Sequence, residues 1–565
     1  MSRSPNEQLV EKLNLLKSDF TAQGARSVLA LLRKLRQFSI RDAESLVLYH
    51  ETLLFIRAYP HDGSIVSAVE SQLRSFHQRV KFLSELDADL SPIGHPEISG
   101  ISGDSVSDTF TFDIVRWLAR KFPRQIRLDW DWFEGENRLA DAWPRFMPLF
   151  EEDTFVEANI PYREWLRLAR NGTSEIEWLL AHFEKLPVSE RQKAEIYNAQ
   201  QLYVRWMPAY QSTRTGLRFG DDRSVFYQHG PLIPRRDVNL RSEVTKPVSA
   251  IRLLSLKEGE RAMDLAKEAS TVRYRELYGF THGDPKRVGE VKLDRGLCLH
   301  VIALPPDRRL PLRAYHAAMI YRNRVPVGYF EGLSVCEKME SGFNLYYTFR
   351  EGETAWIYAQ TLNVMHHLTG VSAFSLDPYQ IGHENKEGIE SGAFWFYRKL
   401  GFRSTDPKLR QLTANEEKKL ASRKNYRTSS ATLRKLAQAP MIFELEEKHQ
   451  GEWDRFQVRN IGFRVQKRMA QQFNGDASMM REKTIGLVGD ALGFDSKQSG
   501  EAQQRIFADF APALSLIRDL PGWTESEKEQ LVSIIRAKAG VDENQYLREM
   551  QKHEKLRREL IRLGS

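Results

Sequence analysis

The segment from residue 389 to residue 402 reads Ile389-Glu390-Ser391-Gly392-Ala393-Phe394-Trp395-Phe396-Tyr397-Arg398-Lys399-Leu400-Gly401-Phe402. Ala393, Phe394, Tyr397 and Leu400 follow the spacing of one buried helical face. Gly401 suits the left-handed residue that closes a helix. The segment therefore predicts a short aromatic helix, stopped by a glycine, with Tyr397 on its buried side.

The residues around this helix predict an alternation of strands and helices. Alternating or aromatic, β-branched runs indicate strands, and longer stretches with helical apolar spacing indicate helices. Arg322-Asn323-Arg324-Val325 lies between two such runs and indicates a hairpin. The predicted strands are 250–256, 315–321, 326–331, 343–349, 372–376 and 441–445, and the predicted helices are 257–269 and 357–368.

This order of elements resembles the acyl-CoA-binding domain of the GNAT superfamily of N-acetyltransferases, over residues 248–448. The resemblance implies an α/β domain with a mixed sheet, flanked here by all-α helical domains. It also implies acetyl-CoA or another acyl-CoA as co-substrate and an amine-bearing acceptor. In those enzymes two neighbouring strands splay apart, and a backbone N–H in the gap binds the oxyanion; the corresponding residues here are 344–349.

The turn before the second predicted helix is the candidate site for the diphosphate of the cofactor. A helix start offers unpaired backbone N–H groups and a favourable dipole for an anion. The candidate cofactor-binding residues are Phe349, Arg350, Gly352, Thr354, Ala355 and Glu390. Phe349 replaces the family's Gln or Arg, and Glu390 stands where the family commonly has an asparagine. An ordinary helix start, with Glu351 and Glu353 complementing the dipole, is the alternative interpretation.

The family has a tyrosine at the position of Tyr397, which is therefore the candidate general acid for the departing thiolate. Packing in the core is its alternative role. The candidate bases are Glu331, Asp377 and His383, each of which has a surface or hydrogen-bonding role as the alternative. The polar loop 377–388 follows a predicted strand, where substrate-contacting residues commonly lie.

The rest of the chain predicts helical domains. Apolar residues recur at helical spacing over residues 1–92, and residues 108–215 are helical and rich in tryptophan. We expect domains at 1–92, 108–215, 248–448 and 449–565, with an extended connector at 211–246. The tryptophans either line a groove or anchor a core.

Composition excludes some classes of protein and partner. The net charge of +8, from 83 basic and 75 acidic residues, does not indicate nucleic acid, and acidic residues interrupt the basic faces near residues 455–468 and 546–563. No apolar segment long enough to cross a membrane is found, so a cytoplasmic location is expected. Cys298 and Cys336 cannot form a metal cluster by themselves, the adjacent His366 and His367 lack metal-ligand spacing, and no metal is expected.

Three functions remain open from the sequence. The first is an acyl-CoA-dependent N-acyltransferase of unknown acceptor. The second is a catalytically inactive GNAT-like protein that binds a ligand. The third is a helical scaffold that docks another protein or a nucleic acid through its basic helices.

Overall fold

The computed structural model describes residues 5–133, 135–147, 161–220, 224–495 and 499–565. The chain forms two compact units. Unit 1 comprises residues 1–231, 261–281 and 323–326, and unit 2 comprises residues 232–260, 282–322 and 327–565. The helix α12 (Leu256–Thr271) runs across the boundary between them.

Unit 1 is mainly helical, as its apolar periodicity predicts. Its first five helices are α1 (Pro5–Leu16), α2 (Ala22–Arg36), α3 (Ala43–Ala58), α4 (Gly63–Arg74) and α5 (Phe76–Glu85). Asp42 and Asp62 begin α3 and α4 by accepting bonds from the amides of Ser45 and Ile65, which is the standard role of aspartate at a helix start.

The tryptophan-rich segment adds a small sheet that the sequence analysis missed. Its antiparallel strands are ordered β1 (Val106–Asp108), β3 (Val204–Trp206), β2 (Ile126–Leu128). The helices of this segment are α6 (Phe112–Lys121), α7 (Glu136–Leu139), α8 (Tyr162–Ala169), α9 (Glu175–Lys185) and α10 (Glu190–Gln200), and α13 (Tyr278–His282) lies at the end of the unit. Trp117, Trp143 and Trp206 are buried, so these three act as core anchors, whereas Trp132 is exposed.

Unit 2 contains a nine-stranded mixed sheet in the order β11-β12-β10-β9-β8-β7-β6-β5-β4. The strands are β4 (Arg252–Leu253), β5 (Val288–Lys292), β6 (Leu297–Ala303), β7 (Ala314–Arg322), β8 (Val325–Val335), β9 (Lys338–Leu345), β10 (Ala373–Leu376), β11 (Arg403–Ser404) and β12 (Met441–Glu444). β9 and β10 are parallel, and β12 is inserted antiparallel between β10 and β11. The fold class is therefore α/β with a large mixed sheet, accompanied by many helices.

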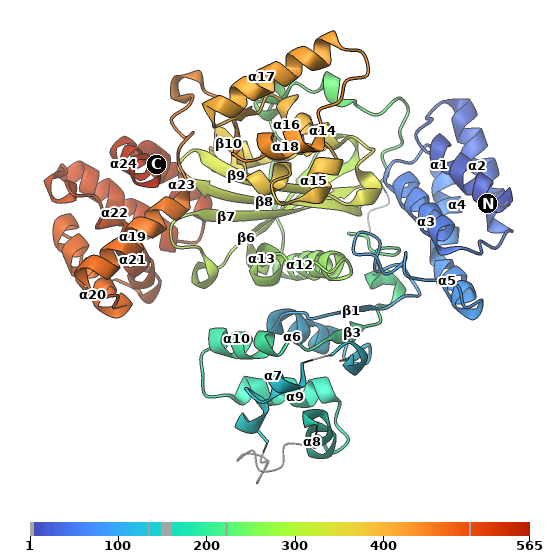
Figure 1. Cartoon of the computed structure of the whole chain (residues 1–565), viewed down its shortest axis with the longest axis horizontal. Coiled ribbons are helices and arrows are strands. Elements are labelled where there is room, and N and C mark those ends of the chain that lie inside the picture. Colours follow the sequence, from blue (N-terminus) through green and yellow to red (C-terminus); the bar gives the residue numbers. More distant parts are fainter. Residues whose placement is uncertain (1–4, 134, 148–160, 221–223, 496–498) are drawn as a thin grey trace. The chain divides into compact units, whose positions relative to one another are not determined.

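One face of the sheet is covered by helices that follow the strands in sequence (Figure 1). They are α14 (Thr354–Thr369), α15 (Lys386–Glu390), α16 (Ala393–Arg398), α17 (Pro407–Ser422) and α18 (Ser430–Leu436), and α11 (Leu240–Val244) packs against α14. The Phe343 ring of β9 packs on Tyr358 of α14, at 4.9 Å between ring centroids. Because side chains alternate along a strand, Phe343 marks the covered face and Gly342 and Asn344 belong to the opposite face.

The predicted strand at 343–349 begins earlier and ends earlier than expected. β9 ends at Leu345, and residues 347–349 form a short 3-10 turn. Strands β5 and β6 were not predicted at all, and the predicted first strand is reduced to two residues. The predicted glycine stop is confirmed, because Gly401 has φ +104° after α16.

The C-terminal helices share a core with the sheet. They are α19 (Val458–Gln472), α20 (Ala477–Leu492), α21 (Glu501–Leu514), α22 (Glu525–Ala539), α23 (Glu543–Lys552) and α24 (Glu554–Gly564). Buried residues from these helices form one cluster with Ala314, Val335, Cys336, Ala373 and Ile442 of the sheet region. The boundary expected near residue 448 therefore lies inside a single compact unit.

Candidate functional site

The two parallel strands β9 and β10 separate after a short stretch of pairing. Their paired residues are Ala373 with Lys338, Phe374 with Met339 and Ser375 with Glu340. β10 ends at Leu376, whereas β9 continues to Leu345. We call the space beside residues 341–345 of β9, beyond the end of β10, the strand gap.

The side chain of Gln380 lies in the strand gap. Its Nε2 donates to the carbonyl oxygen of Phe343 at 2.8 Å and to the hydroxyl oxygen of Tyr397 at 3.0 Å. Gln380 belongs to the turn after β10, and Tyr397 belongs to α16. The Gln380 amide thus links the edge of β9 to the hydroxyl of Tyr397, the candidate general acid.

Tyr397 itself is buried, with 3% of its surface exposed. Its ring packs edge-on against Tyr358 and Phe402, at 5.5 and 5.7 Å between centroids. Burial raises the pKa of the Tyr397 phenol, and the bond from Gln380 opposes this effect only in part. The hydroxyl is therefore protonated at neutral pH, as a proton donor must be.

A buried carboxylate stands at the start of α14. Glu353 is fully buried, and its carboxylate pairs with Arg322 at 3.0 Å and with Arg295. No side chain caps α14, and Gly352 and Thr354 remain half-buried. Arg350 donates from Nε to the Leu345 carbonyl at 3.0 Å and pairs with Glu387 at 2.6 Å. The turn is thus stabilised by internal charge pairs while part of its backbone faces outward.

The face of the sheet opposite α14 carries a half-buried carboxyl next to the strand gap. Glu331 of β8 lies opposite Gly342 of β9, and the hydroxyl of Tyr315 donates to it. Burial raises the pKa of Glu331. Two residues along β9, the buried Oδ1 of Asn344 has no hydrogen-bond partner among the described residues. Such an atom costs free energy unless a ligand or water donates to it.

A cavity of about 1250 Å³ opens on the same face of the sheet. Its walls include Glu340 and Ser375, the last pair before the strands separate, so the cavity reaches the closed end of the strand gap. Asp377 and His383 also line it, and both are exposed. The structure therefore brings two of the three predicted bases into one cavity.

Lys338 and Glu340 give this cavity opposite charges at its sheet wall. Lys338 lies with Nζ 5.5 Å from the centre of the Phe456 ring, and Glu340 pairs weakly with Arg313 at 3.7 Å. Burial lowers the pKa of Lys338, with Glu340 opposing the shift and Arg313 adding to it. A lysine of this kind loses its proton more easily than one in water.

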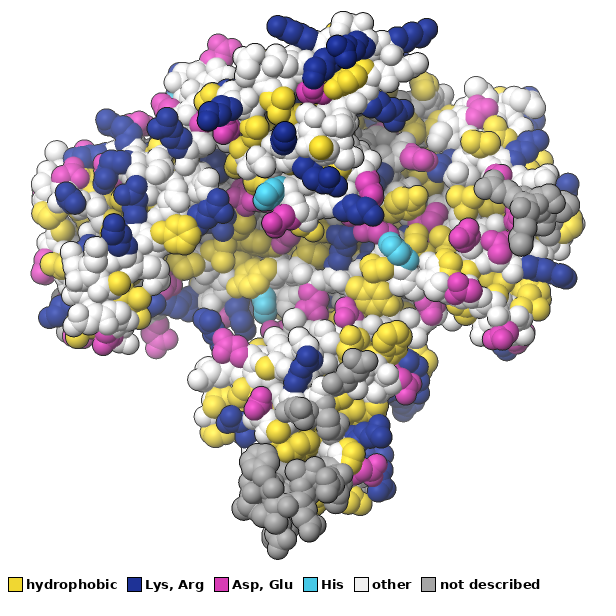
Figure 2. Space-filling model, viewed as in Figure 1, with side chains coloured by type: hydrophobic (Ala, Val, Ile, Leu, Met, Phe, Trp, Pro, Cys, Tyr) yellow, Lys and Arg dark blue, Asp and Glu magenta, His cyan; other side chains and the backbone are white. Residues whose placement is uncertain are grey.

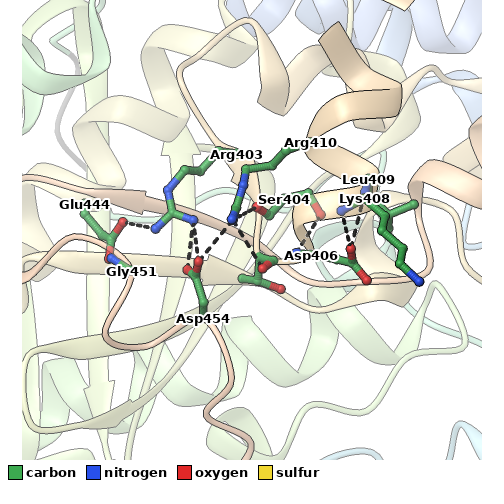
Figure 3. A network of polar contacts seen from close by, with 10 residues as sticks. Arg403, Ser404, Asp406, Lys408, Leu409, Arg410, Glu444, Gly451 and Asp454 are labelled. Carbon is green, nitrogen blue, oxygen red and sulfur yellow. Dashed lines mark hydrogen bonds and ion pairs between the residues drawn. The ribbon is translucent and has the colours of Figure 1, made fainter. Parts of the chain in front are cut away.

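The outer wall of the cavity is a loop held by charged groups (Figure 3). Asp454 of this loop accepts from Arg403 of β11 at 2.8 and 3.0 Å and from Arg410 of α17 at 3.1 Å. Arg403 also pairs with Glu444 of β12 at 2.5 Å. We call this set of four charged side chains the Asp454 network.

A second set of charged groups holds the two residues of this loop that directly precede Asp454. Trp453 donates from Nε1 to Glu337 at 2.6 Å, and Arg557 of α24 pairs with Glu337 and with Glu452, each at 2.6 Å. The cavity therefore lies between the sheet and the loop that contains Asp454. Contacts from the sheet edge and from the C-terminal helices hold this loop in place.

The predicted cofactor residues have separate structural roles. Phe349 and Ala355 are core residues, with 1% and 3% of their surface exposed. Thr354 donates from its hydroxyl to the Arg350 carbonyl at 2.9 Å. Glu390 is exposed and pairs with Lys386 one helical turn away at 3.5 Å, so its contact is local.

Sequence reasoning missed Gln380, Lys338 and Glu340, whereas Asn344 was included in the segment 344–349 expected to border the gap. Gln380 was included in the polar loop but not singled out, and its position in the turn that begins at Pro378, just after β10, was the available signal. Lys338 and Glu340 alternate along a strand, which places both on one face, but the start of β9 was not predicted.

Two arginines of the predicted basic face bind the C-terminal helices. Arg464 donates from Nε to the Leu563 carbonyl at 2.9 Å, and Arg468 donates to the Ser515 hydroxyl at 2.8 Å. Figure 2 shows the Lys and Arg side chains of these helices separated by acidic and neutral ones. Part of this face is thus structural.

Comparisons with protein-family models, with curated proteins and with solved structures found no match to the chain. Among the described residues, no helix combines the length and the apolar character that crossing a membrane requires.

Proposed function

We propose that the protein is an acyl-CoA-dependent N-acyltransferase, with the transfer site at the strand gap. The observation that carries the proposal is the separation of the parallel strands β9 and β10 after three residue pairs, at a point where a large cavity reaches them. A thioester arm needs such a gap to reach the far face of a sheet. The order of strands around it also resembles that of the GNAT superfamily.

In the proposed reaction, the acyl-CoA enters from the side of α14 and the amine from the cavity. The amine nitrogen bonds to the thioester carbonyl carbon, and the carbon–sulfur bond breaks. Glu331, directly or through water, takes the proton that the amine loses, and Tyr397 protonates the departing thiolate. Glu331 and Tyr397 lie on opposite faces of the sheet, which supports this division of roles. The proton from the amine moves on the face of Glu331, and the proton to the thiolate moves on the face of Tyr397.

The cavity favours an acceptor that carries both charge signs. Lys338 and Glu340 stand on one wall, and Asp377, His383 and Glu384 stand at another. An amine with a nearby carboxylate, as in an amino acid or the end of a peptide, would pair with both kinds of group.

Gln380 supports a second function, a GNAT-like protein that binds a ligand without transferring an acyl group. Its side-chain amide donates hydrogen bonds both to the Phe343 carbonyl of β9 and to the Tyr397 hydroxyl. A thioester arm would have to displace that amide before Tyr397 could reach the sulfur.

One experiment separates the two functions. The full-length protein is incubated with acetyl-CoA and a panel of amino acids and short peptides, and both the thermal midpoint and the release of free thiol are followed. A raised midpoint with thiol release supports transfer. A raised midpoint without thiol release supports ligand binding alone, and no response in either readout contradicts both.

A further inference from the structure

A separate cluster of three side chains lies on the face of the sheet opposite α14, on strands β5 and β6. It consists of Glu290, Cys298 and His300. Glu290 and His300 are directly opposite each other across the strand pair, and Cys298 precedes His300 by two residues on β6. Since side chains alternate along a strand, all three belong to one face.

The potential ligand atoms of this cluster are already close together. The thiol sulfur, an imidazole nitrogen and a carboxylate oxygen all lie within 4.8 Å of one another. Oε2 of Glu290 and Nε2 of His300 are 3.7 Å apart. Bonds of about 2.0–2.3 Å in a tetrahedral zinc site require ligand atoms roughly 3.3–3.8 Å apart, so only small side-chain movements are needed.

Neighbouring groups orient two of these ligands. Arg252 of β4 donates from Nε to Oε1 of Glu290 at 3.0 Å, which leaves Oε2 as the oxygen that faces His300. The Tyr321 ring packs against the His300 ring at 4.7 Å between centroids. Such outer contacts are what hold ligating carboxylates and imidazoles in place in metal sites.

Burial and ligand type narrow the choice of ion. The side chains of Glu290 and His300 are 5% and 1% exposed, and Cys298 is half-buried, which leaves access to the cluster from the thiol side. Thiolate, imidazole and carboxylate together suit zinc and chemically similar divalent ions, whereas calcium and magnesium prefer oxygen ligands alone. A thiolate and a carboxylate also balance the charge of a divalent ion.

We propose that Glu290, Cys298 and His300 bind one zinc ion, with a water molecule as the fourth ligand. On binding, Cys298 releases its thiol proton to solvent and the sulfur bonds to the metal. The metal site is separate from the proposed acyl-transfer site. His300 is opposite Met319 of β7, and Met319 is four residues along β7 from Tyr315, which contacts Glu331. At about 3.3 Å per residue, this offset alone is about 13 Å.

The first test uses Co²⁺ as a spectroscopic probe of the full-length, chelator-treated protein. We expect one equivalent to bind, with a thiolate-to-cobalt absorption band in the near ultraviolet that added Zn²⁺ removes. Cys298→Ala should abolish the band. Cys336→Ala removes the other cysteine, which is buried elsewhere in the unit 2 core, and should leave the band intact. Absence of the band in the unmodified protein, or its persistence in Cys298→Ala, would overturn the proposal.

A second test needs no variant. The unmodified protein is treated with a thiol-alkylating reagent with and without Zn²⁺, and both cysteine peptides are quantified by mass spectrometry. Bound zinc should slow alkylation of Cys298 at least tenfold and leave Cys336 unchanged. Equal rates at Cys298 in both conditions contradict the site even if the substituted proteins fail to fold.

Discussion

The side-chain amide of Gln380 donates to the main-chain carbonyl of Phe343 at 2.8 Å. Gln380 is in the turn after β10, so a side chain satisfies a strand edge that β10 leaves unpaired. This contact links the turn after β10 to the edge of β9 beyond the paired residues. Under the proposed acyl transfer, a thioester arm has to displace the Gln380 amide from Phe343 and Tyr397. Replacing Gln380 therefore tests whether this amide hinders cofactor binding.

Replacing Gln380 with alanine should empty the strand gap. The loss of its two hydrogen bonds should lower the free energy of unfolding by about 1–3 kcal/mol, because a typical hydrogen bond contributes about 0.5–1.5 kcal/mol. Acetyl-CoA should then bind more tightly, by isothermal titration calorimetry, since no amide has to be displaced. Gln411→Ala, on the exposed side of α17, is the control. Weaker binding in Gln380→Ala would instead make Gln380 a ligand contact.

Tyr397→Phe should reduce turnover far more than cofactor affinity. The phenyl ring keeps the packing against Tyr358 and Phe402 but cannot donate a proton. The loss in kcat should be roughly 10²-fold or more, with the dissociation constant of acetyl-CoA within about threefold. Tyr278→Phe, at an exposed residue of α13 that does not line the cavity, should change neither quantity. An unaltered kcat in Tyr397→Phe would exclude Tyr397 as the general acid.

The Asp454 network should stabilise the cavity wall measurably. Asp454→Asn removes a charge that two arginines share, and these groups are only 16–37% exposed. We expect a loss of about 1–3 kcal/mol in urea unfolding, and an interaction energy with Arg403→Gln of at least about 0.5 kcal/mol in a double-mutant cycle. The exposed pair Lys386 and Glu390 is the comparison, and Glu390→Gln should cost less than about 1 kcal/mol.

Glu353→Gln should be more costly than any surface change. The substitution removes the negative charge that Arg322 and Arg295 share at the start of α14, in an environment where Glu353 and Arg322 are fully buried. Breaking a buried pair by removing one partner typically costs about 3–5 kcal/mol. Thermal unfolding of the full chain measures the loss. Added sulfate should restore part of the stability if the freed arginines bind it, and a change below about 1 kcal/mol would show that they are satisfied without Glu353.

Unit 1 should lose stability as the pH falls, in part because of His50. This ring is buried between Glu51 and Thr215, with Arg214 bound to the other oxygen of Glu51. Burial lowers the pKa of His50 from 6.5 to about 4. The unfolded chain therefore binds the proton more readily than the folded one between these values, and stability falls as the pH drops from 6.5 towards 4. The full effect is about 3 kcal/mol.

The measurement is the urea midpoint of unfolding at several pH values, for the unmodified protein and for His50→Gln. Glutamine keeps a hydrogen-bonding side chain in the same place but does not titrate. We expect the slope of stability against pH to be smaller in His50→Gln over that range. Identical slopes would assign the pH dependence to other buried groups of unit 1 such as His61, whose pKa burial also lowers.

Features that depend on residues close together in the chain could be predicted from the sequence alone. The glycine stop at Gly401 follows from the conformational freedom of glycine, and α14 and α16 follow from local apolar spacing. The hairpin around Asn323 and Arg324 follows from a polar turn between two β-branched runs.

The strand gap, the cavity and the cluster of Glu290, Cys298 and His300 depend on tertiary packing. Gln380 and Phe343 are 37 residues apart, and Glu353 and Arg295 are 58 residues apart. Their meeting depends on the register of β9 against β10 and on packing against helices distant in sequence, which local preferences do not fix. Cys298 and His300 are near neighbours in the chain, but only the pairing of β5 with β6 brings Glu290 to them.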